Sequence, residues 1–161
     1  MNISRSFWTA AWLASLMVLH FTLRPMLDWR VQVDFLIIAL LLVAVTARPA
    51  IAAFFGFALG MVTDSLTPAA FGAGALAMTL VGFASSWLKS AFFTENLMLN
   101  AGFVFLGKWA FDVIYILAEH RLGGVDLVAQ LLLWSPLSAV LTAVVGLGVL
   151  VVSRPPATKR R

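Results

Sequence analysis

Three acids and one lysine stand inside or beside long apolar runs of this chain, where charged groups could do chemistry. Lys108 and Asp112 lie four residues apart within LMLNAGFVFLGKWAFDVIYILA. Side chains at this spacing share one face of a helix, so the two can form an ion pair or pass a proton between them. One charged side chain costs about 2.5–3.5 kcal/mol at the centre of a bilayer. The two side chains must therefore face each other, another helix or trapped water, and not lipid.

The Lys108–Asp112 pair has two interpretations. A structural ion pair would pin its helix into a bundle, whereas a proton or ion relay would need further titratable groups at the same depth. The two histidines of the chain, His20 and His120, fall at the predicted outer ends of apolar runs, where amphipathic rings favour the interface. Asp64 would be a third titratable group of such a relay only if its own helix ended deep in the membrane. We therefore favour the structural ion pair.

Asp64 ends the stretch GFALGMVTD, in which Gly56, Gly60 and Asp64 follow one another at intervals of four. On a helix they form one stripe. GxxxG lets two helix backbones approach closely in lipid, so we predict that this stripe is a partner or helix-packing face. Asp64 would then either cap a helix end or belong to a binding or assembly site. The surface opposite the stripe could be a helix of this chain or another protein.

Motifs for catalysis are missing from the sequence. It has no cysteine, no H-E-x-x-H pattern, no P-loop and no dinucleotide fingerprint. Its serines in apolar runs have no evident basic partner for nucleophilic catalysis. We expect a protein that is not an enzyme and uses neither a metal nor a cofactor.

The elements that must position these residues are membrane helices. The chain of 161 residues is 62% hydrophobic and 11% charged, with a mean hydropathy of +1.00. A soluble domain has about 25% charged residues. A span needs about 20 apolar residues, and this predicts an all-α integral membrane bundle of about six transmembrane helices. The expected spans are Phe7–Leu23, Val31–Ala47, Ala50–Thr63, Ala69–Leu88, Leu97–Ala118 and Leu127–Val152.

Two of these spans are unusual, since the third is short and the last contains Pro136, which should kink it. We expect one transmembrane domain over residues 1–152 and a short basic tail over residues 153–161. Basic residues favour the cytoplasmic side of a membrane, and their distribution predicts that both termini lie inside. The inner segments would hold Arg5, Arg48, Lys89, Arg154, Lys159, Arg160 and Arg161, and the outer segments Arg24, Arg30 and Arg121. The net charge of +4 thus reflects membrane topology and lipid contact rather than binding of nucleic acid.

Three stretches, DFLIIALLLVAVTARP, GFALGMVTDSLTPAAFG and GALAMTLVGFASSWL, resemble the MreD family, the small integral membrane component of the bacterial cell-elongation machinery. In that family an acid opens the second span, and Asp34 holds this place, with Val33 where the family commonly has proline. The family's G-x-x-x-D turn corresponds to Gly60 and Asp64, and its following glycine to Gly72. Gly74 stands where the family often has histidine or asparagine.

The resemblance implies a multi-pass protein of the bacterial cytoplasmic (inner) membrane with six spans and both termini inside. It implies a non-enzymatic scaffold that binds MreC directly and joins MreB, RodA and a class B penicillin-binding protein in a complex for lateral-wall peptidoglycan synthesis. The family's bundle is also thought similar in shape to the substrate-binding subunits of energy-coupling-factor transporters. The alternative function is therefore a small-solute, vitamin-like binding subunit of a transporter, to which Asp64, Asp34 and Trp29 could contribute polar groups.

Overall fold

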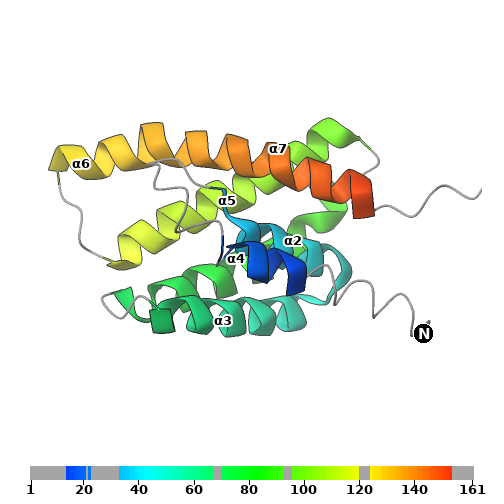
Figure 1. Ribbon diagram of the computed structural model, residues 1–161, viewed down its shortest axis with the longest axis horizontal. Coiled ribbons are helices and arrows are strands. Elements are labelled where there is room, and N and C mark those ends of the chain that lie inside the picture. The colour runs from blue at the N-terminus through cyan, green and yellow to red at the C-terminus, as the bar shows by residue number, and fades with distance from the viewer. Residues whose placement is uncertain are drawn as a thin grey trace, which may run out of the picture.

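The computed structural model describes residues 14–20, 22, 33–66, 70–92, 96–119 and 124–153, and every regular element among them is a helix. Residues 14–20 form an N-terminal helical segment. The elements that follow are α2 (Phe35–Thr46), α3 (Pro49–Leu66), α4 (Ala73–Phe92), α5 (Leu97–Glu119), α6 (Gly124–Ala129), the π-helix η2 (Gln130–Trp134) and α7 (Ser135–Ser153). Figure 1 shows α7 along one edge of the bundle and α3 along the opposite edge, with α2, α4 and α5 between them. The all-α prediction is confirmed for these residues.

The short helix α2 forms the centre of the bundle. Its sequence FLIIALLLVAVT is apolar on all sides, and its first seven residues are buried. Twelve residues give a length of about 18 Å, well below the 30 Å or so of a hydrocarbon layer. Its far end is held by Ser86 Oγ and Lys89 Nζ, which donate to the carbonyl of Ala47 at 2.8 and 2.6 Å. The first turn of α2 consequently lies inside the bundle.

Among the residues that the structure describes, three helices are long and apolar enough to cross a membrane: Pro49–Leu66, Leu97–Glu119 and Asp126–Val149. The prediction of a short third span, Ala50–Thr63, was wrong, because the helix continues to Leu66. The hydroxyls of Thr63 and Ser65 donate to carbonyls three residues back, at 2.8 and 2.7 Å, so these polar residues fit the helix. Of the predicted first span, Phe7–Leu23, only the residues given above are described, and the tail from residue 154 onward lies outside the described ranges.

A π-helical turn stands immediately before Pro136, where the sequence predicted a kink. In this turn the N–H of Ser135 donates to the carbonyl of Gln130, five residues back. The next carbonyl, that of Leu131, would be due the N–H of residue 136, which proline lacks. The indole Nε1 of Trp109 on α5 lies 3.5 Å from this oxygen and donates to it. The bulge thus accommodates the proline, and a side chain from the neighbouring helix serves the carbonyl next to the bulge.

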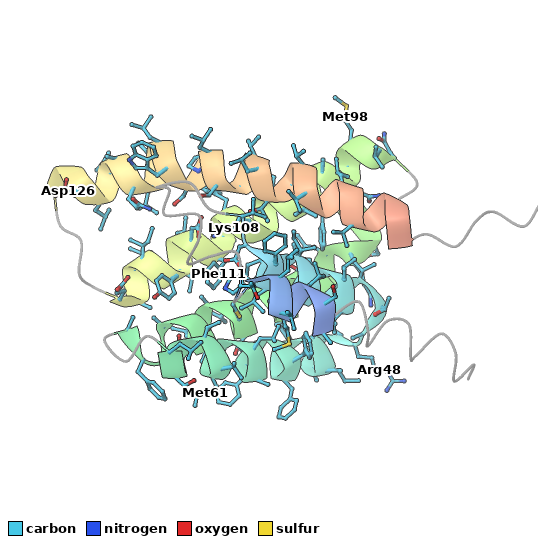
Figure 2. The ribbon with its side chains drawn as sticks, in the orientation of Figure 1. Arg48, Met61, Met98, Lys108, Phe111 and Asp126 are labelled. Atoms are coloured by element: carbon cyan, nitrogen blue, oxygen red, sulfur yellow. The ribbon has the colours of Figure 1, made fainter. Side chains whose placement is uncertain are left out.

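Several polar side chains are buried in the described bundle beside its apolar core, and many large apolar side chains face outward. His20, Asp64, Asn100, Lys108 and Thr142 are all buried. Phe54 and Trp87, in contrast, are 73% and 72% exposed. In Figure 2 Lys108 and Phe111 lie in the interior, while Met98 points away from the helices. A water-soluble protein exposes its charges and leaves few large aromatic side chains on its surface, so the buried charges and the outward-facing aromatic side chains suit a lipid surround.

Candidate functional site: a buried charge cluster and a glycine-lined hairpin

Lys108 lies at the centre of a largely buried charge cluster formed by His20, Asp34, Lys108 and Asp112. Its ammonium group donates to Asp112 Oδ1, one turn further along α5, and lies 3.4 Å from Asp34 Oδ2 at the start of α2. The Lys108 side chain is buried, and its Nζ also sits 5.1 Å from the centre of the Phe111 ring. The structure therefore brings together the predicted ion pair and adds a second carboxylate from another helix.

Asp34 connects four parts of the chain. Its side chain caps α2 by accepting the N–H of Ile37 at 3.4 Å. Its own backbone N–H donates to Thr142 Oγ1 of α7 at 3.2 Å, and the hydroxyl of Thr142 is fully buried. His20 Nδ1, from the N-terminal helical segment, lies 3.6 Å from Asp34 Oδ1. One residue thus links that segment, α2, α5 and α7.

The placement of His20 corrects an expectation from sequence. We expected this ring in the interface at the outer end of a span, but it is 2% exposed and faces Asp34 inside the bundle. The N-terminal helical segment packs on the start of α2 through Leu16, and this packing brings the ring to Asp34. Nothing in the spacing of the sequence connects His20 with Asp34, fourteen residues later.

The charge cluster can hold or exchange protons, because it places an imidazole, an ammonium and two carboxylates in one contiguous set. The buried hydroxyl of Ser135 on α7 lies beside Asp112. Within the described ranges, no three His, Cys, Asp or Glu side chains are placed to hold a metal ion. The cluster's four members also tie separate helices together, which is a structural role.

Asp64 lies apart from the charge cluster and closes the hairpin between α3 and α4. Its Oδ2 accepts the N–H groups of Gly72 and Ala75, both at 2.9 Å, and its Oδ1 accepts that of Gly74 at 3.1 Å. These donors stand at the start of α4, where a helix leaves its first N–H groups without partners and favours negative charge. Gly72 has φ +97°, a conformation that suits glycine. The buried carboxylate therefore serves as a cap for the next helix.

Gly56 and Gly60 pack against α4 of the same chain. A Cβ added to Gly56 would overlap the carbonyl of Met78, and one added to Gly60 would overlap the backbone of Ala75. From the other side, a Cβ on Gly82 of α4 would lie 2.6 Å from the carbonyl oxygen of Ala52. Of the two alternatives for this face, the structure places a helix of this chain opposite the stripe. The glycines and Asp64 together form a close-packed hairpin.

Gly74 belongs both to the Asp64 cap, to which its N–H donates, and to the close contact between α3 and α4. A Cβ at this position would overlap Asp64 Oδ1, so the bare backbone is what lets the carboxylate reach the first turn of α4. The sequence alone gave no reason to connect Gly74 with Asp64, ten residues earlier.

Comparisons of the chain with known protein families, with characterised proteins and with solved structures found no match.

Proposed function

We propose that the chain is a multi-pass protein of the bacterial inner membrane, with about six spans and both termini in the cytoplasm, and that it acts as a non-enzymatic scaffold. The burial of charged and polar side chains beneath an outward-facing apolar surface is the observation that carries this proposal. Phe54 and Trp87 face outward while Lys108, Asp64 and Asn100 are buried. Such a surface is stable in lipid, where exposed polar groups are costly and apolar ones are not.

The scaffold role is supported by the contacts of Gly56, Gly60 and Asp64, all of which join α3 to α4. The two oxygens of Asp64 receive three backbone N–H groups, and Gly56 and Gly60 are in contact with α4. The hydrogen bonds of Asp64 and the close contacts of the two glycines are thus used to join α3 to α4. The motif thus builds a rigid helical hairpin, which is what a protein that holds other membrane proteins in place requires.

The resemblance to the MreD family supplies the proposed partners. We expect direct binding of MreC, and through it a complex with MreB, RodA and a class B penicillin-binding protein. With the glycine stripe occupied by α4, the partner surface must lie on side chains that face outward. Along the hairpin these include Phe54, Phe57, Phe83 and Trp87, all exposed. Aromatic side chains of this kind supply large contact areas to a neighbouring helix.

The transporter alternative gains no support from the geometry. A vitamin-like solute would need polar groups that converge on one cavity. Asp64 is bonded to the start of α4, and Asp34 is bonded within the charge cluster. Trp29 lies outside the described residues.

Photocrosslinking in living cells tests the scaffold proposal. A photoreactive amino acid would replace Phe54, Phe57, Phe83 or Trp87 in turn, with buried Leu59 as the matched control. We expect at least one exposed position to capture MreC and the control to capture nothing. Depletion of the protein should give rounded cells. Recovery of an ATPase pair without any wall-synthesis protein would contradict the proposal.

A further inference from the structure

Arg48 and Lys89 come close together at the end of the bundle where α3 begins. Lys89 Nζ donates to the carbonyl oxygen of Ala47 at 2.6 Å, and this carbonyl belongs to the peptide bond that joins Ala47 to Arg48. The carbonyl of Arg48 in turn accepts the N–H groups of Ile51 and Ala52, both at 3.0 Å, so the first turn of α3 fixes the backbone at this position. The fold thus holds two cationic residues at one turn, although one precedes α3 and the other lies in the last turn of α4.

Most of the hydrogen-bond donors of these two side chains are available to a ligand. Arg48 is exposed, and within the described ranges its guanidinium bonds to no residue. Figure 2 shows this side chain pointing away from the helices. The half-buried ammonium of Lys89 has three N–H donors, and among the described residues its one bonded partner is the carbonyl of Ala47. The turn can therefore receive an anion.

The described residues supply no acid to balance the two charges. Those that the structure describes lie in the interior or towards the other end of the bundle: Asp34, Asp64, Asp112, Glu119 and Asp126. In Figure 2 Asp126 and Arg48 stand at opposite ends of the molecule. Glu95, in the link from α4 to α5, lies outside the described ranges. The charge at this turn accordingly favours a negatively charged ligand.

Exposed apolar side chains lie directly beside the two cations. Ile51, in the first turn of α3, is 57% exposed, and Leu88, next to Lys89 on α4, is 44% exposed. Trp87 is 72% exposed, and tryptophan favours the boundary between lipid head groups and hydrocarbon. Cations beside an outward apolar surface match a phospholipid, which joins a charged phosphate to acyl chains.

We propose that Arg48 and Lys89 bind the phosphate of an anionic phospholipid, whose acyl chains lie along the outward side of α3 and α4 beside Ile51 and Leu88. A guanidinium forms two parallel hydrogen bonds to a phosphate, and an ammonium adds a compact charge. Basic pockets between membrane helices bind anionic head groups in this way. This inference goes beyond the scaffold role and holds whichever proteins the bundle binds.

Native mass spectrometry of the full-length protein, released from detergent micelles, tests the lipid site. Phosphatidylglycerol is titrated as the anionic lipid and phosphatidylcholine as the zwitterionic reference, and the fraction of protein carrying lipid gives each dissociation constant. The test variants are Arg48→Gln, Lys89→Gln and Arg48→Lys. Arg121→Gln is the matched control, because it removes one positive charge from a segment that the sequence places on the other side of the membrane.

We expect the unmodified protein to bind phosphatidylglycerol more tightly than phosphatidylcholine. Each glutamine substitution at the site should weaken binding of phosphatidylglycerol about fivefold, because a basic residue near a membrane surface contributes about that factor. Binding of phosphatidylcholine should not change. Arg48→Lys, which keeps the charge, should lose less affinity than Arg48→Gln, and Arg121→Gln should lose none.

Three results would overturn the site. The first is equal affinity of Arg48→Gln and the unmodified protein for phosphatidylglycerol, and this variant removes a side chain that bonds to no described residue. The second is an equal loss of affinity in Arg121→Gln, since net charge alone would then explain the binding. The third is displacement of the lipid by inorganic phosphate at matched concentration, which would show a site for free anions. No partner protein enters the measurement, so failure of the lipid site is distinct from failure of the scaffold proposal.

Discussion

The carboxylate of Asp64 accepts the backbone N–H of Ala75 at 2.9 Å, across the turn that joins α3 to α4. Two further N–H groups of the same turn point at this side chain. This arrangement explains why the apolar helix α3, with its stripe of glycines, carries Asp64 near its C-terminal end. The glycines bring the two helices together, and the acid satisfies the first donors of the second helix.

Asp64→Asn should destabilise the bundle by about 1.5–3 kcal/mol, because the amide replaces one accepting oxygen by a donor that faces backbone N–H groups. The midpoint of unfolding in mixed micelles, titrated with SDS, measures the change. Asp126→Asn is the matched control, since Asp126 is exposed in the first turn of α6. Equal midpoints for the two variants would show that the cap contributes nothing.

Gly60→Ala should cost about 1–3 kcal/mol, because the new methyl group overlaps the backbone of Ala75 and forces α3 and α4 apart. Gly102→Ala provides the control, as a Cβ there meets nothing within 4 Å. Alanine at an open helical position should instead stabilise by about 0.5–1 kcal/mol. The same SDS titration reports both. A stabilising Gly60→Ala substitution would show that the two helices are not in close contact at this point.

Lys108→Leu should lower the amount of folded protein sharply, because it leaves the largely buried carboxylates of Asp34 and Asp112 without their shared cation. Removing one partner of a buried pair costs about 3–5 kcal/mol. Fluorescence-detected size-exclusion chromatography in mild detergent measures the folded fraction. The double variant Lys108→Leu/Asp112→Leu, which strands only one of the carboxylates, should recover part of the yield. Full yield from the single variant would contradict the cluster's structural role.

Trp109→Phe should cost about 1 kcal/mol, because the indole donates to the carbonyl of Leu131 where Pro136 cannot. Pro136→Ala restores a backbone N–H at that position. In the Pro136→Ala background the Trp109→Phe substitution should therefore cost much less. A double-mutant cycle on the unfolding midpoints measures this coupling. Additive effects would mean that the indole and the proline act independently.

Relationships within a single helix were predictable from the sequence. The shared face of Lys108 and Asp112 follows from a spacing of four, and so does the stripe of Gly56, Gly60 and Asp64. The helical character of the described residues follows from the long apolar runs. The end of α3 was missed, because Thr63 and Ser65 resemble a turn in sequence but bond to their own helix.

Contacts between helices were decided by tertiary structure. Asp34 meets Lys108 across 74 residues of chain, and this depends on the packing of α2 against α5. His20 reaches Asp34 because the N-terminal helical segment packs on α2. The glycine stripe could have faced a partner protein, and only the packing of α3 on α4 placed it inside. The sequence by itself determined which faces of each helix are small, apolar or charged, because helical periodicity is local. Which faces meet, and at what depth, depends on the packing of the whole bundle.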